Sequence, residues 1–284
     1  MQEEAVGCFC VLRRFVSDRR ISSMAVALPL LVFTDLDGTL IAHDTYSWAA
    51  ARPALEALHR LGAGLVMASS KTAPEIAVLR AAVGFSHWPA IVENGAGVLA
   101  AGCDDAGQGG HYRSLRAVLD ALPARLRKHY RGFGDMTAQE IGRITGLPEA
   151  TAKLAARRAF SEPGLWSGTQ LLRTEFLQAL ARAGVSAREG GRFLTLSFGQ
   201  TKADRMADVI AQYHPLHTVA LGDAPNDVEM LQAADFGIIV ANPHRAPLPV
   251  LAKETQGRIL RTELAGPSGW NVAILDHIAR LGLE

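Results

Sequence analysis

Short runs of consecutive apolar residues alternate along the first hundred positions with segments whose apolar residues recur every three or four positions. Continuous runs of this length are typical of strands that are buried on both faces of a sheet. They lie at residues 30–34, 64–69 and 90–92. Helical spacing predicts one helix from Pro53 to Gly62 and another whose first turn contains Pro74. This β-α-β-α-β order predicts a parallel sheet with right-handed crossovers.

The pattern changes after about Gly97. A Gly-rich polar stretch follows, and residues 111–190 are dominated by helical spacing before one more strand pattern at 191–198. Alternation then resumes with a helix from Lys202 and strands at 218–223 and 236–241. We therefore predict an α/β protein with a doubly wound parallel sheet as its core. The core comprises residues 25–98 and 199–284, and an α/β cap domain, residues 99–198, is inserted into it.

The N-terminal segment has two interpretations. Arginines precede the apolar stretch "MAVALPLLVF", which resembles the basic and apolar regions of a secretory leader. However, the apolar stretch continues directly into the first predicted strand, and no small-residue cleavage site follows it. We favour the strand, and we expect residues 1–24 to form a poorly ordered extension, with Met24 as a possible true start.

Composition narrows the classes of function. The chain has 284 residues, 49% of them hydrophobic, and a formal net charge of +1, so neither a nucleic-acid surface nor a polybasic membrane patch is indicated. No apolar run reaches the roughly 18 residues of a membrane span. Three cysteines without a paired spacing favour a reducing, cytoplasmic setting, and nine scattered histidines form no metal motif. An acidic small molecule remains compatible as a substrate.

Reactive side chains occur where apolar strands end or where a helix begins. In open parallel sheets such positions converge on one crevice at the carboxyl ends of the strands. The residues are Asp35 and Asp37 after the first strand, Ser69 after the second, Lys202 at a helix start, and Asp223 and Asp227 in "GDAPND". The sequence therefore predicts one site with an acidic cluster, a hydroxyl and a cation.

This set of residue types suits phosphoryl transfer. Crowded carboxylates repel one another unless a cation neutralises them, and oxygen ligands select hard ions such as Mg²⁺. A carboxylate beside Mg²⁺ can attack phosphorus, and a second acid nearby can protonate the leaving group and later activate water. Ser69 and Lys202 would donate hydrogen bonds to the phosphoryl oxygens.

Four motifs occur in this order: "DLDGT" at residues 35–39, the strand-terminal Ser69 before a helix, the helix-opening Lys202, and "GDAPND" at residues 222–227. They resemble the motifs of haloacid-dehalogenase-superfamily phosphatases, and the insertion lies between the second and third, where the α/β cap class carries its cap. A narrower resemblance, to the mannosyl-3-phosphoglycerate phosphatases, covers nearly everything from about Leu30 onward. It rests on "SSKTAPEI", "IVENGAGV", "RAFSEP", "GGRFLTL", "GDAPNDVEML" and "GPSGW".

The resemblance implies specific roles. Asp35 would be the nucleophile and Asp37 the general acid/base, while Ser69 and Lys202 would bind phosphate. Asp35, the backbone carbonyl of Asp37, and Asp223 would hold Mg²⁺, with Asn226 and Asp227 as supporting residues. The residues expected near the substrate are Ser70, Lys71, Glu93, Asn94, Arg158 and Arg192.

The chain departs from the wider pattern at two places. Its second motif is Ser69-Ser70-Lys71, as in this subfamily, whereas many superfamily members have Thr-Gly-Arg. Thr195 stands where relatives are expected to have histidine, and this bears on substrate preference.

The resemblance implies Mg²⁺-dependent hydrolysis of a phosphorylated glycosyl-glycerate, the mannosyl form first. The alternatives on the same core are a glucosyl-3-phosphoglycerate or sucrose-phosphate phosphatase and a phosphomutase. A different class of function, a non-catalytic module that senses a phosphorylated metabolite, is disfavoured by the intact set of Asp35, Asp37, Lys202 and Asp223.

Overall fold

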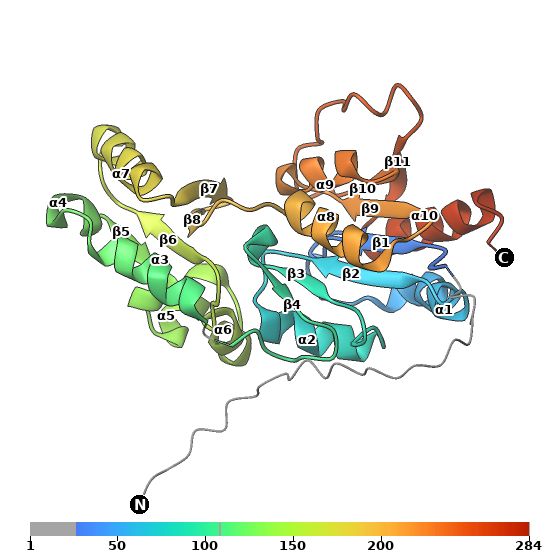
Figure 1. The fold of residues 1–284 in the computed structure, drawn as a ribbon, viewed down its shortest axis with the longest axis horizontal. Coiled ribbons are helices and arrows are strands. Elements are labelled where there is room, and N and C mark those ends of the chain that lie inside the picture. The colour runs from blue at the N-terminus through green and yellow to red at the C-terminus, as the bar shows by residue number, and fades with distance from the viewer. Residues whose placement is uncertain (1–26, 108, 284) are drawn as a thin grey trace, which may run out of the picture.

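The computed structural model describes residues 27–107 and 109–283, so the predicted extension at residues 1–24 lies outside the described residues. The larger of its two sheets has seven strands in the order β11-β10-β9-β1-β2-β3-β4. All neighbouring pairs are parallel except β3 and β4. Helices cover this sheet, as Figure 1 shows. The predicted doubly wound α/β core is confirmed.

The strands of the core follow the apolar runs of the sequence. Their bounds are β1 (Leu31–Thr34), β2 (Gly64–Ala68), β3 (Ala90–Val92), β4 (Gly97–Leu99), β9 (Thr218–Gly222), β10 (Phe236–Ala241) and β11 (Ile259–Ala265). β1, β2, β3 and β9 are buried throughout, which accounts for their uninterrupted apolar sequences. β1 lies between β2 and β9, so the two parts of the core sequence meet at its edges.

Three of the five core helices, at residues 52–60, 73–82 and 202–213, begin close to the predicted positions. The five are α1 (Arg52–Arg60), α2 (Ala73–Ala82), α8 (Lys202–Tyr213), α9 (Val228–Ala233) and α10 (Gly266–Arg280). Strands β4 and β11 and helices α9 and α10 were not predicted, although "GPSGW" lies at the start of α10. There the fully buried Trp270 donates its indole N–H to the Thr34 hydroxyl at 3.0 Å, which fastens α10 to β1.

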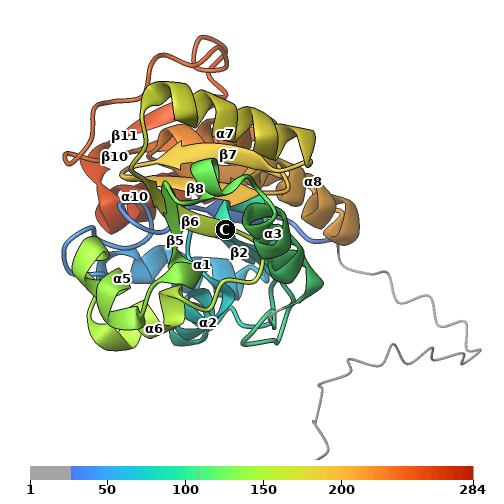
Figure 2. The same ribbon diagram turned by 90° about the vertical axis from the view of Figure 1, so that its left-hand side faces the viewer.

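Residues 110–197 form a second body around an antiparallel sheet in the order β5-β6-β8-β7. Its strands are β5 (Tyr130–Gly132), β6 (Glu162–Trp166), β7 (Ser186–Gly190) and β8 (Phe193–Ser197). Its helices are α3 (Gly110–Asp120), α4 (Ala124–Arg127), α5 (Ala138–Thr145), α6 (Glu149–Ala155) and α7 (Gln170–Arg182). We call this body the cap; Figure 2 shows its elements in front of the core.

The cap has its own apolar clusters, one built around Leu115, Phe176 and Leu196 and a smaller one around Phe133 and Ile141. Of its four strands, only β8 was predicted. β5 has three residues, β6 contains Pro163 and Gly164, and β7 is mostly exposed. None of the three presents the long apolar run by which the core strands were recognised.

Candidate active site

The predicted catalytic residues come together at the carboxyl ends of β1, β2 and β9. Asp35 directly follows β1, Ser69 follows β2 and Asp223 follows β9, while Lys202 is the first residue of α8. All four are buried, with exposed fractions of 8% or less. Parallel strands that end side by side bring these residues to one edge of the sheet.

Lys202 is the central cation of the site. Its ammonium donates to Asp35 Oδ1 at 2.6 Å and to Asp227 Oδ1 at 2.7 Å. Burial acts to lower the pKa of Lys202, but the two carboxylates outweigh it, and the pKa is raised above its ordinary value. Lys202 therefore remains protonated and holds the two strand-end carboxylates at fixed positions.

Asp227 uses its second oxygen to shape the loop after β9. Its Oδ2 accepts from the backbone N–H groups of Asp223 at 3.1 Å and Ala224 at 3.0 Å. Complete burial raises the pKa of Asp227 to about 6, with Asp35 adding to the shift and Lys202 opposing it. Asp227 therefore links Lys202 to the loop after β9, which is the position of a supporting residue.

Asp223 is held by two residues to which the sequence analysis assigned no role. The Thr39 hydroxyl donates to Asp223 Oδ1 at 3.0 Å, and the Asn242 amide donates to Oδ2 at 2.7 Å. Arg245 lies 3.6 Å from the same Oδ2. Thr39 belongs to the "DLDGT" motif, and Asn242 directly follows strand β10. The position of Asn242 at a strand end was the available signal for it.

The donor set fits a hard divalent cation. One carboxylate oxygen from each of Asp35, Asp223 and Asp227 lies within 4.8 Å of the others. Asp35 Oδ2 has no hydrogen-bond partner among the described residues. Burial raises the pKa of Asp35, with Lys202 opposing and Asp223 and Asp37 adding to the shift. A cation bound here would relieve this excess of negative charge.

Asp37 is not part of this group of three carboxylates. Its Oδ2 forms an ion pair with Lys71 Nζ, and the two atoms are 2.9 Å apart. Its Oδ1 is buried and has no hydrogen-bond partner among the residues described. Lys71 also lies over the ring of Tyr46, 5.2 Å from its centroid. Burial acts to lower the pKa of Lys71, but Asp37 and Glu75 raise it above its ordinary value. Asp37 is therefore a separately held carboxylate beside Asp35.

The helix that follows the second motif is capped by Thr72 and not by Ser69. Ser69 by itself is a possible helix N-cap, yet Thr72 precedes the first residue of α2, and its backbone N–H donates to Glu75 Oε2 at 2.9 Å. The Ser69 hydroxyl oxygen accepts from the Lys71 N–H at 3.3 Å, in the crevice. Ser70 is exposed.

Glu93 and Arg158 bind each other and the cap. The Glu93 carboxylate accepts from the backbone N–H groups of Ala159, Phe160 and Ser161 at 2.7–3.2 Å, and Arg158 Nε lies 3.3 Å from it. Arg158 also donates to the Ser70 carbonyl at 3.2 Å. Both side chains are at least 95% buried, so neither faces open space in this arrangement, and their predicted contact with substrate stays a prediction.

The remaining predicted residues are more accessible. Asn226 donates to Asn94 Oδ1 at 3.1 Å, which joins the loop after β9 to the short 3₁₀ turn η2 (Glu93–Gly95). Arg192 is exposed on the cap and donates to the Ile144 carbonyl. In this structure Arg192 thus contacts its own domain.

Comparisons with known proteins agree with this geometry. Residues 192–253 match the family model of the haloacid dehalogenase-like hydrolases. A phosphatase of this superfamily from Bacteroides thetaiotaomicron has the same fold, with a TM-score of 0.60 and 18% identity over 94% of this chain and all of the other. The sucrose-phosphatase of Synechocystis, solved with sucrose and phosphate, covers 90% of this chain and 98% of its own at 15% identity and a TM-score of 0.56. At these identities the structures establish the fold alone.

Two curated relatives are considerably more similar. A glucosyl-3-phosphoglycerate/mannosyl-3-phosphoglycerate phosphatase from Persephonella marina is 33% identical over 88% of this chain and 99% of its own. A protein of the same name from Methanococcoides burtonii is 32% identical over 88% of this chain and 97% of its own. The chain belongs to this family of haloacid dehalogenase-like phosphatases, and it is a phosphoric monoester hydrolase. Among the described residues, no helix is long and apolar enough to cross a membrane.

Proposed function

We propose that this protein hydrolyses mannosyl-3-phosphoglycerate to mannosylglycerate and inorganic phosphate in a Mg²⁺-dependent reaction. The observation that carries the proposal is the buried trio of Asp35, Lys202 and Asp227, in which Lys202 Nζ lies 2.6 Å from the nucleophile candidate. A lysine at this place can donate to a phosphoryl oxygen while it keeps Asp35 aligned for attack.

In the first step, Asp35 Oδ2 attacks phosphorus, and the bond between phosphorus and the glycerate oxygen breaks. Asp37, which enters this step protonated, donates its proton to the departing oxygen, and Asp35 carries the phosphoryl group as an aspartyl phosphate. In the second step, Asp37 takes a proton from water, the water oxygen attacks phosphorus, and the Asp35 carboxylate is released. Ser69 and Lys202 donate hydrogen bonds to the phosphoryl oxygens in both steps.

Mg²⁺ would be held by Asp35, Asp223 and the Asp37 carbonyl, with Asn226 and Asp227 in support. When bound, it would neutralise the negative charge of the carboxylates and the phosphoryl group. Asn242 and Thr39 orient Asp223 for this task through the two hydrogen bonds described above.

For the substrate, we propose that Ser70, Lys71 and Asn94 contact its glycerate or sugar part. Ser70 is exposed, and Lys71 and Asn94 are half-buried at the edge of the crevice. A cation such as Lys71 beside Asp37 suits a substrate with a carboxylate next to its phosphate. Arg192 would have to leave the Ile144 carbonyl to contact a substrate.

A second candidate substrate is glucosyl-3-phosphoglycerate, since the names of both curated relatives include the two sugars. The test is phosphate release from mannosyl-3-phosphoglycerate, glucosyl-3-phosphoglycerate, sucrose phosphate and simple hexose phosphates, each with and without Mg²⁺. We expect the mannosyl substrate to have the highest kcat/KM and activity to require Mg²⁺. If it is hydrolysed no faster than simple hexose phosphates, the substrate proposal is wrong.

A further inference from the structure

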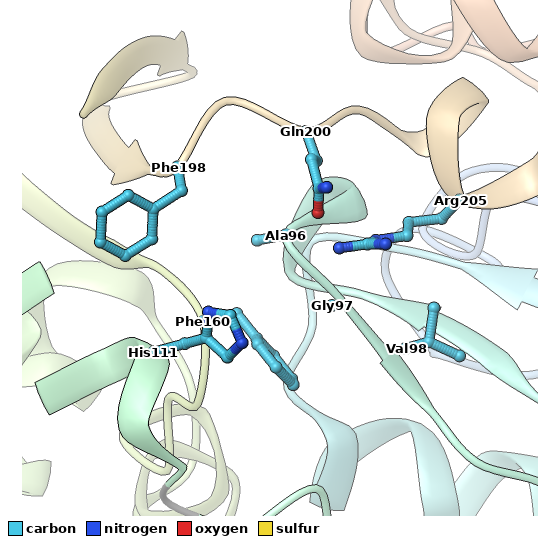
Figure 3. A pocket seen from close by; sticks show the side chains of 8 residues that line it. All are labelled: Ala96, Gly97, Val98, His111, Phe160, Phe198, Gln200 and Arg205. Carbon is cyan, nitrogen blue, oxygen red and sulfur yellow. The ribbon is translucent and has the colours of Figure 1, made fainter. Parts of the chain in front are cut away.

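A cavity of about 360 Å³ lies where the cap joins the core, outside the catalytic cluster. Its lining residues are Ala96, Gly97, Val98, His111, Phe160, Phe198, Gln200 and Arg205, shown in Figure 3. None of them is a predicted catalytic, metal or substrate residue. The volume is in the range of known small-molecule sites.

Both connections between the core and the cap contribute to this cavity. Ala96–Val98 lie before the first connection and His111 lies at its end, while Phe198 and Gln200 belong to the second connection, between β8 and α8. Gly95 packs against the backbone of Thr201 so tightly that an added Cβ would lie 2.0 Å from its carbonyl carbon. The start of α8 and the turn η2 therefore separate the cavity from Asp35.

The charged group of the cavity is Arg205, whose side chain extends from α8 toward it (Figure 3). Its Nη1 donates to Asp208 at 2.9 Å on the same helix. Its Nε is buried and has no hydrogen-bond partner among the described residues, and no partner is found there for Nη2. Asp208 therefore uses only part of the donor capacity of this guanidinium, and a cation that lines a cavity favours an anionic ligand such as a carboxylate.

The other lining groups complement such a ligand. The Gln200 amide points into the cavity, and neither it nor the His111 ring has a hydrogen-bond partner among the residues described. Phe160, Phe198 and Val98 provide apolar walls. The described residues that line the cavity include no acidic side chain. We propose that this hinge cavity is a second binding site, which takes a small aliphatic carboxylate and couples its binding to movement of the cap.

The coupling follows from the position of the cavity. A ligand that contacts residues of both the core and the cap binds most tightly to the arrangement of the two in which all those residues surround the cavity. It stabilises this arrangement by the difference between its affinities for this arrangement and for the open one. Release of product from a capped site requires the cap to open. A carboxylate in the hinge cavity should therefore slow turnover, and it should lower kcat and KM together. A carboxylate that competes in the active site would instead raise KM and leave kcat unchanged.

The test measures phosphate release from the best substrate as a function of butyrate, with butyramide as the uncharged comparison. We expect butyrate, but not butyramide, to lower kcat by about fivefold at saturation. Arg205→Gln should abolish this effect, His111→Leu should weaken it, and Arg258→Gln, which replaces an exposed arginine distant from the cavity, should retain it. Saturation-transfer NMR should detect butyrate bound to the wild-type protein and to Arg258→Gln, but not to Arg205→Gln.

Several outcomes would overturn the proposal: a kcat that does not respond to butyrate, an equal response to butyramide, or a response that survives in Arg205→Gln. A change in KM alone would assign butyrate to the active site and would equally overturn it. His111→Leu changes only an exposed cap side chain, so it provides an independent answer if Arg205→Gln fails to fold.

Discussion

The core and the cap each hold a group of carboxylates, and the two groups differ in how their charge is compensated. In the cap, Glu162 accepts from Tyr112 at 2.6 Å, from Arg116 at 2.8 Å and from the Gly134 N–H at 2.8 Å. Asp135 pairs with Arg116 and Arg127. The negative charges of these two acids are thus balanced by the positive charges of two arginines. In the core, Asp35, Asp223 and Asp227 have one buried cation, Lys202, between them.

This difference separates a structural network from a reactive one. A buried carboxylate that has all its donors holds elements together and has no capacity left for a ligand. The core cluster has an excess of negative charge and a free Asp35 oxygen, which a metal ion and a phosphoryl group can use. Burial of charge alone would not have distinguished the two groups.

Asp35→Asn should break the reactive network most completely. The amide is a poor nucleophile, so we expect kcat to fall by about a thousandfold or more while the fold is retained. Phosphate release and the thermal melting curve measure the two properties. Asp44→Asn, an exposed aspartate in the following loop, is the matched control and should keep full activity. Turnover that persists in Asp35→Asn would refute the assigned nucleophile.

Lys202→Met tests the cation of the core. It should lower kcat by roughly a hundredfold or more. It should also destabilise the protein by about 3–5 kcal/mol, because two buried carboxylates lose their partner. This loss of stability should be smaller at pH 5 than at pH 8, because protonation of the two carboxylates at the lower pH removes the repulsion between them. Urea unfolding at both pH values measures the loss of stability. The control is Lys153→Met on the cap surface, which should change the free energy of unfolding very little. An equal loss at both pH values would contradict the interpretation.

Glu162→Gln applies a similar change to the cap network. The variant leaves Arg116 with less compensation, so we expect a loss of about 1–3 kcal/mol in the free energy of unfolding. Because the network is structural, kcat should change by less than about twofold. Urea unfolding and phosphate release report on the two effects. A large fall in kcat with normal stability would show that this network takes part in the reaction.

Glu93→Gln tests the contact between the two bodies. The amide offers one acceptor to three backbone donors, so we expect faster hydrogen exchange at residues 159–161 and a loss of about 1–3 kcal/mol. A matched Arg158→Gln variant, alone and combined with it, should show coupling between the two residues. If Glu93 binds substrate instead, KM would rise and hydrogen exchange at 159–161 would stay unchanged.

The smallest expected effect is at the start of α5. Arg131 and the backbone N–H of Thr137 lower the pKa of Glu140 to about 2 from an ordinary value of 4.5. A carboxyl group whose pKa is lowered by folding stabilises the protein above pH 4.5, and this stabilisation is lost as the pH falls toward about 2. The difference in urea midpoint between wild type and Glu140→Gln should therefore shrink between pH 5 and pH 3. Glu56→Gln on α1, an exposed glutamate, should show no such trend.

Much of the core could be predicted because its signals are local. Uninterrupted apolar runs mark β1, β2 and β9, and the residues that follow them, Asp35, Ser69 and Asp223, are at strand ends by sequence position alone. Parallel pairing then places these ends together, so most of the catalytic cluster follows from the order of the elements. The cap offered weaker signals: β7 is mostly exposed and β6 contains proline and glycine, so neither shows a strand pattern.

The sequence by itself determined the α/β class and the set of carboxylates, hydroxyl and lysine that suits phosphoryl transfer. Only the tertiary structure decided the partners: that Lys202 joins Asp35 to Asp227, that Lys71 holds Asp37, and that Glu93 binds the cap backbone. The physical reason is that hydrogen bonds and ion pairs act over about 3 Å. Sequence spacing places a residue on an element, whereas the packing of elements determines which atoms come within that distance.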